Sequence, residues 1–409
     1  MRPLAEFRGV ERAVVFKGGV PAATLERRRD AVAFAYEPSY RVGGGPPVAT
    51  TLPLSRVPVL THAAGALPPF FSGLLPEGRR LLALRTALKT SADDEFSILL
   101  AVGGDAVGDV TVVPEGDPGV EPVAPAVVVG AWDEIRFRDL LPSSGGTAWK
   151  MDRVAIPGVQ DKISAGLINL PVARRGERYL LKLDPPEFPH LVANEDFFLQ
   201  AARDSGLETA EAEVVHDQEG VPGLLVRRFD RVANPDGSVR LLPQEDGCQV
   251  LGRYPADKYR VTTEEVIGAL SAVCQARPVA ALTLLRQVAF AYLSCNGDAH
   301  AKNFSILALP DGEWRVTPAY DLPSSYPYAD FTMALSLNGR SREDIGRADF
   351  LALGEAVGVR PRAVEGALDR IRGAVDSWVE ELSRLPFDPE VIHKLRQAIE
   401  YRWNRLGKR

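Results

Sequence analysis

The stretch CNGDAHAKNFSIL, residues 295–307, decides how this chain is interpreted. It places an Asp, a His, a Lys and an Asn within positions 298–303, after a strongly apolar segment and before a short apolar run. Polar groups between two core elements are costly unless they are paired or bind something. The stretch therefore predicts a functional site in a loop just past a long buried helix.

The sequence after this stretch predicts a short β-hairpin. FSILAL is followed by the turn PDGE and then by WRVTP. Because a hairpin brings its two ends together, we expect Tyr320 and Asp321 to lie close to Asp298 and Asn303. Carboxylates this close repel unless they share a proton, meet a basic neighbour or bind a divalent cation. Oxygen ligands of the Asp and Asn type suit Mg²⁺, which often shares its coordination shell with phosphate.

The spacing of these residues narrows the chemistry. Asp298 and Asn303 form D-x-x-x-x-N, the spacing of the protein-kinase catalytic loop, in which the Asp accepts the hydroxyl proton and the Asn holds a metal. Upstream, Lys182 lies in the predicted strand YLLKL, and Glu195 lies in a helix predicted over 193–207. This order matches the Lys–Glu pair that positions nucleotide phosphates in kinases. Each element is weak alone, but the complete order is typical of a kinase.

Simpler interpretations of single residues stay open at this point. Lys182 also suits an edge-strand charge, and Glu195 suits an acid that complements the dipole of a helix at its first turn. For His300, whose favoured role is a ligand contact, the alternative is a structural hydrogen-bond donor.

Composition bounds the class of protein. The 409 residues predict two or three domains. The net charge of -6 argues against a global basic field for nucleic acid or anionic membrane. No apolar run approaches the length of a membrane span, and the N-terminus is unlike a signal peptide. Cys248, Cys274 and Cys295 are isolated, which favours packed, reduced thiols in a cytoplasmic protein.

The distribution of local patterns predicts an α+β chain. Residues 12–60 are strand-rich, with a loop at 41–47, and 74–90 and 94–104 have helical patterns. Helices dominate from 262 onward, and Asn296-Gly297 is expected to end the long helix that begins near Pro278. Pro and Gly concentrate in 114–130. We therefore expect an N-terminal α/β subdomain, a linker, a sheet-rich lobe and a helical lobe, over residues 1–113, 114–130, 131–230 and 231–409.

These motifs together resemble a known family. FFSGLLPEG in the first segment, then PGVQDK, VRRFDR, LPQEDGCQ, NGDAHAKN and TPAYDLP, are similar to HipA, the kinase toxins of bacterial HipBA toxin–antitoxin modules. The similarity runs over nearly the whole chain. It implies a bilobal protein-kinase-like fold, with a phosphate loop and hinge in the 131–230 lobe, the catalytic loop in the helical 231–409 lobe, and an extra N-terminal subdomain.

The resemblance also implies roles for individual residues. Asp298 would be the catalytic base, Asn303 and Asp321 the Mg²⁺ ligands, and Lys182 a contact of the ATP phosphates. Arg227 to Phe229 would form the hinge that meets adenine through its backbone. The other residues implied at the nucleotide are the phosphate-covering loop, Pro157, Gly158, Val159, Gln160, Asp161 and Lys162, and the pocket residues Gln244, His300 and Tyr320.

The function implied is that of an ATP- and Mg²⁺-dependent serine/threonine kinase toxin. Its targets would be translation proteins such as an aminoacyl-tRNA synthetase, and its action would arrest growth. Its partner would be a HipB-like helix-turn-helix antitoxin, which would supply most of the DNA contact; no membrane partner is implied. A small-molecule phosphotransferase or a pseudokinase co-repressor is the alternative. LPQED and PGVQDK argue against the first, and the intact kinase residues argue against the second.

The chain departs from the family pattern at two positions. Arg227 stands where the family often has an acidic residue, but the hinge contact is mainly through the backbone. Ala155 stands where characterised relatives have a Ser whose autophosphorylation ejects the loop. The alternatives are that the switch is missing, that a nearby serine replaces it, or that the Ala is a Ser→Ala change. The candidate replacements are Ser143, Ser144 and Ser164.

Overall fold

The structure is a computed structural model that describes residues 4–62, 66–117, 127–128, 130–140, 168–174 and 177–407. The expected phosphate loop, residues 157–162, lies outside the described residues. So do Ala155 and the three serines considered as its replacements.

The N-terminal part is built on a five-stranded antiparallel sheet in the order β4-β3-β2-β1-β5. Phe34, Phe71 and Phe96 belong to the core that joins the sheet to its helices. This confirms a strand-rich start followed by two helices. The elements are η1 (Leu4–Gly9), β1 (Arg12–Lys17), β2 (Val20–Arg27), β3 (Val32–Tyr36), α1 (Pro38–Val42), β4 (Val59–Thr61), α2 (Pro69–Gly73), α3 (Gly78–Leu88), α4 (Glu95–Val102) and β5 (Val110–Pro114).

The short helix α1 was not predicted, and it overlaps the expected loop at 41–47. Pro38 occupies a first-turn position, where a missing backbone N–H costs nothing. Gly43 then caps the helix after a little more than one turn. The loop proper therefore begins at the glycine run.

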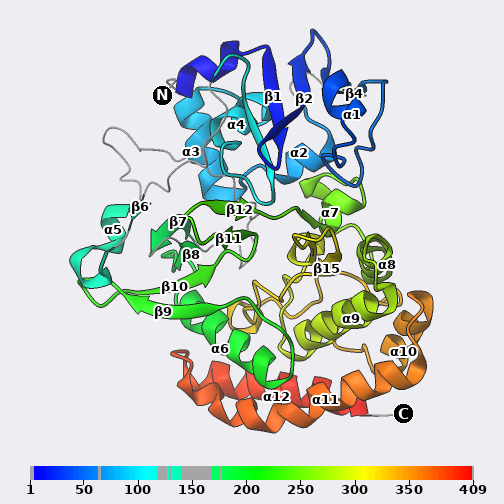
Figure 1. Cartoon of the computed structure of the whole chain (residues 1–409). Coiled ribbons are helices and arrows are strands. Elements are labelled where there is room, and N and C mark those ends of the chain that lie inside the picture. The colour runs from blue at the N-terminus through cyan, green and yellow to red at the C-terminus, as the bar shows by residue number, and fades with distance from the viewer. Residues whose placement is uncertain are drawn as a thin grey trace.

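A second sheet follows, in the order β6-β7-β8-β10-β9, with only the β6–β7 pair parallel. Helix α6 packs against β8, β9 and β10, below the sheet in Figure 1. Strand β6 lies inside the expected linker but joins this sheet. The elements are β6 (Val127–Val128), η2 (Trp132–Glu134), α5 (Phe137–Leu140), β7 (Ile168–Arg174), β8 (Glu177–Leu183), α6 (Leu191–Asp204), β9 (Ala212–His216) and β10 (Pro222–Arg227).

The remainder is mainly helical and has the largest core, with α11 and α12 along the base in Figure 1. Thr262 caps α8 in a capping box with Glu265. None of the described helices is both long enough and apolar enough to cross a bilayer. The helices are α7 (Gly247–Val250), η4 (Pro255–Asp257), α8 (Thr263–Val273), α9 (Arg277–Leu293), η5 (Ala301–Asn303), η6 (Tyr326–Tyr328), α10 (Arg347–Ala356), α11 (Pro361–Val379), η7 (Glu380–Arg384) and α12 (Pro389–Gly407).

Two small antiparallel sheets complete this part. One pairs β11 (Arg231–Ala233) with β12 (Val239–Leu241). The other has the order β13-β14-β15, from β13 (Gln244–Asp246), β14 (Ser305–Ala308) and β15 (Trp314–Val316). The β14–β15 pair confirms the hairpin predicted after the polar stretch.

The end of α9 differs from the prediction. The helix ends at Leu293 with Ser294 as its C-cap, and Cys295 has the left-handed backbone conformation, with φ 57°. Asn296 and Gly297 therefore lie beyond the cap. Gly297 serves a different purpose: a Cβ there would lie 2.6 Å from the Thr332 carbonyl oxygen and 2.7 Å from Ser325 Oγ. Close packing therefore requires a glycine at this position.

The three cysteines are free and buried, as expected.

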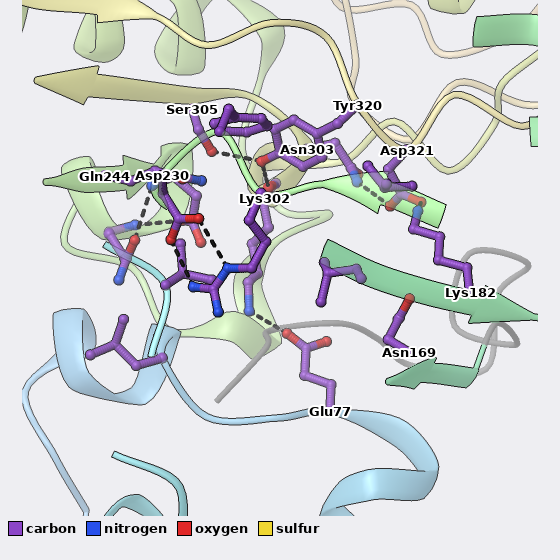
Figure 2. Close-up of a pocket in the computed structure, with 18 of the residues that line it drawn as sticks. Glu77, Asn169, Lys182, Asp230, Gln244, Lys302, Asn303, Ser305, Tyr320 and Asp321 are labelled. Carbon is purple, nitrogen blue, oxygen red and sulfur yellow. Dashed lines mark hydrogen bonds and ion pairs between the residues drawn. The ribbon is translucent and has the colours of Figure 1, made fainter. Parts of the chain in front are cut away.

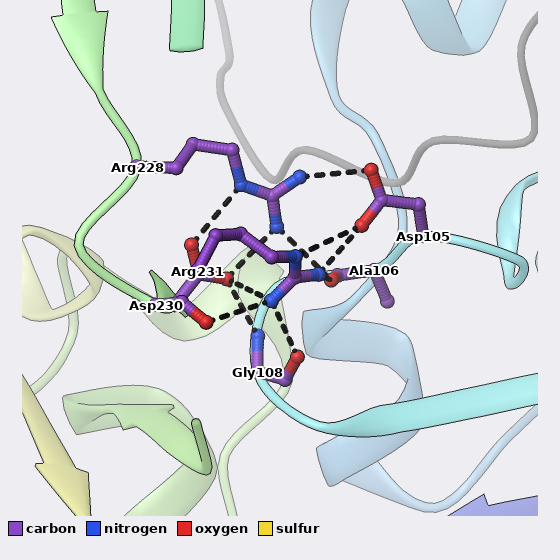
Figure 3. A network of polar contacts seen from close by, with 6 residues as sticks. All are labelled: Asp105, Ala106, Gly108, Arg228, Asp230 and Arg231. Atoms are coloured by element: carbon purple, nitrogen blue, oxygen red, sulfur yellow. Dashed lines mark hydrogen bonds and ion pairs between the residues drawn. The ribbon is translucent and has the colours of Figure 1, made fainter. Parts of the chain in front are cut away.

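A buried ion network joins the N-terminal part to the end of the second sheet (Figure 3). Asp230 accepts hydrogen bonds from Arg228 at 2.8 Å and Arg231 at 2.7 Å. Asp105, in the loop after α4, lies 3.0 Å from Arg228 and 2.6 Å from Arg231. The Gly108 backbone N–H donates to Asp230 at 3.0 Å. Two carboxylates thus offset two guanidinium groups across the junction.

The loop that carries Asp105 also reaches the pocket described below. Gly108 has φ +86°, and a Cβ there would lie 3.2 Å from the backbone N and O of Gln244. A side chain at this position would therefore meet both backbone strain and a backbone clash. The network and this close approach fix the N-terminal part against β13.

Replacing Asp230 with Asn should destabilise the protein strongly. The substitution removes one of two negative charges that offset the buried Arg228 and Arg231, and breaking a buried ion network typically costs about 3–5 kcal/mol. Thermal and denaturant unfolding measure the loss. Asp257→Asn is the control, because its ion pair with Arg260 is largely exposed. Equal loss in both variants would contradict the assigned importance of the network.

The effect of Asp230 should also depend on pH. Burial raises its pKa, but Arg228 and Arg231 outweigh that effect and lower it to about 2, from an ordinary 3.8. A carboxyl group whose pKa is lower in the folded state stabilises the protein above its ordinary pKa, and this contribution disappears as the pH falls toward 2. The stability difference between wild type and Asp230→Asn should therefore narrow between pH 5 and pH 2.5. A constant difference would contradict the assignment.

Candidate active site

A pocket lies where the second sheet, the β13-β14-β15 sheet and the N-terminal part meet (Figure 2). Lys182 and Asp321 lie together at one side of this view, and Gln244 and Asp230 lie at the other. Glu77 approaches from the N-terminal part. The expected site residues that line the pocket are Lys182, Arg227, Phe229, Gln244, His300, Asn303, Tyr320 and Asp321.

Lys182 joins two elements that are far apart in the sequence. It lies on β8 opposite Asn169 of β7 and Leu224 of β10, in the middle of the sheet. This excludes the edge-strand interpretation. Its ammonium group is 2.6 Å from Glu195 of α6 and 3.3 Å from Asp321. The expected Lys–Glu pair is therefore confirmed, with Asp321 as an additional partner.

Burial controls the charges of this cluster. Burial lowers the pKa of Lys182, but Glu195 and Asp321 outweigh that effect, so the pKa lies above its ordinary value. Burial raises the pKa of Glu195 to about 7, against the opposing effect of Lys182. Lys182 is thus a fixed positive charge at the pocket wall, which suits an anionic ligand.

Asn303 and Asp321 meet across the base of the hairpin, as predicted. Asn303 Nδ2 donates to Asp321 Oδ2 at 2.6 Å, and Asn303 Oδ1 accepts from the backbone N–H of His300 at 3.0 Å. The backbone of Asp321 has φ 59°, a left-handed conformation that Asp tolerates better than most residues. Tertiary structure therefore holds this carboxylate in place at some backbone cost.

The donor set here fits a hard divalent cation. An amide and a carboxylate offer oxygen ligands beside Lys182, which is the setting Mg²⁺ uses when phosphate completes its shell. In the structure, the Asn303 amino group faces Asp321. A rotated amide would present Oδ1 to Asp321 instead, at the loss of the hydrogen bond from the His300 backbone, and a cation between the two oxygens would offset their repulsion. Among the described residues, no group of three or more His, Cys, Asp or Glu side chains could hold a metal.

The other side of the pocket has aromatic and polar walls. Phe229 and Tyr320 approach each other with ring centroids 5.8 Å apart. The Tyr320 hydroxyl is fixed by Ser305 Oγ at 2.6 Å and donates to the Lys302 carbonyl at 2.8 Å. Gln244 begins β13, paired with Leu307 of β14. A flat apolar ring with polar edges would be accommodated by such walls.

His300 is buried against the pocket and is held without charge. Burial and the nearby charge of Lys258 lower its pKa well below the ordinary value. Neither ring nitrogen has a hydrogen-bond partner among the described residues. Because buried polar atoms normally have partners, the ring is suited to meet a ligand. This favours a binding role over that of a structural donor.

Asp298 does not line the pocket in this structure. It is buried, and its Oδ1 accepts a hydrogen bond of 2.5 Å from the hydroxyl group of Tyr259. Its own backbone N–H donates to Asn296 Oδ1 at 3.1 Å. Asp298 and Asn303 lie on either side of His300 in one loop. One oxygen of the Asp298 carboxylate already accepts a hydrogen bond from the Tyr259 hydroxyl group.

The charge of Arg227 is engaged by two acidic side chains of neighbouring segments. Its guanidinium group turns outward to Glu177 at 2.7 Å and Glu211 at 3.0 Å. The next residue, Arg228, belongs to the buried network. A basic residue at this hinge position is therefore accommodated on the surface of the sheet.

Sequence reasoning missed several residues at the site. Glu77 and Asn169 line the pocket, and Tyr259 binds Asp298. Asn169 lies in a segment recognised only as a strand. Tyr259 lies in a stretch without any motif. Glu77 offered one signal, an acid within the otherwise apolar FFSGLLPEG.

Comparison with known proteins extends these observations. Two families match: one described as HipA-like C-terminal domain, over residues 154–379, and one described as HipA N-terminal domain, over residues 13–113. A putative kinase of Sinorhizobium fredii, Y4mE, is 31% identical over 406 residues, which cover 93% of each chain. The serine/threonine-protein kinase toxin HipA of Shewanella oneidensis is 28% identical over 344 residues, covering 77% of this chain and 75% of that one.

The fold has a counterpart among solved structures. The Shewanella oneidensis complex of HipA, HipB and operator DNA contains a chain that matches with a TM-score of 0.76 at 23% identity, over 97% of both chains. The predicted fold class, α+β and kinase-like, is confirmed.

A double-mutant cycle should show strong coupling between Lys182 and Glu195. Either Lys182→Met or Glu195→Gln leaves the other group buried with poorer compensation, whereas the double variant removes both charges. Contacting residues in such a cluster typically couple by about 1–3 kcal/mol. Unfolding free energies of the four proteins measure the coupling, and the exposed pair Lys394–Glu390 is the control. Simple additivity at Lys182–Glu195 would contradict the described contact.

Proposed function

The chain belongs to the HipA family, and from this premise we propose that it is an ATP-dependent protein serine/threonine kinase. The observation that carries the proposal is the meeting of Lys182, Glu195, Asn303 and Asp321 at one side of a pocket. These residues come from a strand, a helix and both ends of a hairpin. Their order and their contacts match the parts that kinases use to hold nucleotide phosphates.

In the proposed reaction, the γ-phosphoryl group of ATP passes in line to a serine hydroxyl. The hydroxyl oxygen forms the new bond to phosphorus, the bond from phosphorus to the β-phosphate oxygen breaks, and ADP leaves. Asp298 orients the hydroxyl and takes its proton. Lys182 offsets negative charge on the phosphates, and Glu195 fixes the position of Lys182. Asn303 and Asp321 would hold Mg²⁺, which neutralises phosphate charge when bound.

Nucleotide recognition is proposed to use the opposite wall of the pocket. Phe229 and Tyr320 would contact the adenine ring, the backbone at Arg227–Phe229 would bind its edge, and Gln244 would add a polar contact. His300 would bind the nucleotide through a ring nitrogen. Residues 157–162 are proposed to cover the phosphates, on the basis of the family resemblance alone.

The proposed biological role is that of a toxin acting in the cytoplasm. The target would be a protein of translation, such as an aminoacyl-tRNA synthetase, and the consequence would be growth arrest. The structural counterpart is a complex with HipB and operator DNA. We propose a similar helix-turn-helix antitoxin as the partner here, with DNA contacted mainly through it.

Phosphoryl transfer from γ-labelled ATP and Mg²⁺ into a bacterial lysate tests the proposal. Wild type should label a protein band, and Asp298→Asn should lower the rate by roughly a thousandfold, because proton transfer and alignment are both lost. Asp321→Ala should lower it by roughly a hundredfold or more. Both variants should remain folded by circular dichroism.

The outcomes separate the candidate functions. A labelled band that disappears in Asp298→Asn supports a protein kinase, and its identity names the target. Label on the chain alone supports a self-modifying kinase. ATP binding without any labelled protein would contradict the proposal and favour a small-molecule phosphotransferase or a pseudokinase. Near-normal turnover by Asp321→Ala would contradict the metal assignment.

A further inference from the structure

Glu77 of the N-terminal part reaches into the helical lobe and binds two lysines there. Its Oε2 is 2.7 Å from Lys258 Nζ, and its Oε1 accepts a hydrogen bond from Lys302 Nζ. Lys302 also lies within 3.5 Å of the Gly73 carbonyl oxygen. One carboxylate is therefore shared between two ammonium groups from different segments of the helical lobe.

This arrangement is buried, and its charges depend on one another. The side chains of Lys258 and Lys302 are 1% and 5% exposed, and that of Glu77 is 12% exposed. Burial raises the pKa of Glu77, but Lys302 and Lys258 outweigh it and lower that pKa to about 2. The carboxylate is thus a permanent anion, and without it the two buried cations would repel each other at close range.

Glu77 stands at the N-cap position of α3, and its side chain makes no capping hydrogen bond. Glu is not one of the side chains that commonly cap helices, so the carboxylate can extend to the lysines of the helical lobe without the loss of a favourable local cap.

Each lysine is adjacent to a residue of the proposed catalytic apparatus. Lys258 precedes Tyr259, which donates to Asp298. The Lys258 carbonyl also accepts from the backbone N–H of Ala301, within the catalytic loop. Lys302 precedes Asn303, which donates to Asp321. Glu77 therefore holds together the two segments that fix the catalytic carboxylate and the metal-binding amide.

We propose that Glu77 is a positioning residue through which the N-terminal part aligns the catalytic loop. The expected effect on the rate rests on the proposed kinase function. The structural coupling between Glu77 and the two segments does not depend on that function. The competing interpretation is a staple that stabilises the fold and leaves the chemistry unaffected. The two interpretations differ in whether kcat changes in protein that is fully folded.

Glu77→Gln in the full chain tests the proposal. The amide keeps the size of the side chain, but it carries no charge to offset the two lysines. It also has a single oxygen, so it accepts hydrogen bonds from both lysines less effectively than the carboxylate. Below the unfolding transition, kcat for phosphoryl transfer should fall roughly tenfold or more, since small misplacements of catalytic groups are costly.

Thr50→Val is the matched control. Thr50 also belongs to the N-terminal part, and its hydroxyl donates across the junction to Glu245 of β13 at 2.7 Å, rather than to Lys258 or Lys302. It should leave kcat within about twofold of wild type while removing an interdomain hydrogen bond. If Glu77→Gln lowers only the thermal midpoint and kcat stays within the same range, the positioning role is overturned.

Hydrogen–deuterium exchange provides a readout that does not need kinase activity. Glu77→Gln should raise exchange in both segments, 256–262 and 298–304. Lys258→Met keeps the contact between Glu77 and Lys302 and should raise exchange mainly in 256–262. Unchanged exchange in both variants would overturn the coupling. If the wild type has no kinase activity but the two variants show the expected rise in exchange, the kinase proposal is refuted. The alignment of the two segments by Glu77 would still stand.

Discussion

The buried ammonium group of Lys182 is the constraint on which the rest of the site depends. It lies on a central strand, and among the described residues its charge is offset by two carboxylates from other elements, Glu195 on α6 and Asp321 after the β14–β15 hairpin. A lysine this deeply buried is tolerated because both partners are present. The charge of Lys182 is therefore compensated when the sheet, α6 and the β14–β15 hairpin are all in place. Asn303 joins the same cluster through its contact with Asp321.

The N-terminal part is tied to this centre by charge as well as by packing. Asp105 offsets the charge of the arginines that flank Asp230, just after β10. Glu77 neutralises the lysines beside Tyr259 and Asn303. In both places an acid from the N-terminal part offsets buried bases of the remaining chain. An appended domain with an independent role would not need such contacts, so this arrangement makes the N-terminal part a component of the pocket.

The sequence was informative where local pattern and topology decide the structure. The hairpin that begins at the end of residues 295–307 follows from turn chemistry, and the meeting of Asn303 with Asp321 follows from the hairpin. The predicted end of α9 was wrong, because Cys295 rather than Gly297 adopts the left-handed conformation after the helix. Glycine is needed at position 297 because the chain packs closely against Thr332 there. Glu77 and Tyr259 were missed since their partners lie far away in the chain. The family resemblance, rather than spacing, suggested Gln244 and the hinge, and their roles stay predictions.

A crystal structure of the chain with Mn²⁺ and a non-hydrolysable ATP analogue would test the proposed nucleotide site directly. We expect anomalous Mn²⁺ density between the side chains of Asn303 and Asp321, with the analogue's phosphates at Lys182 and its base near Phe229 and Gln244. A nucleotide bound elsewhere, or Mn²⁺ held without either Asn303 or Asp321, would contradict the proposed site.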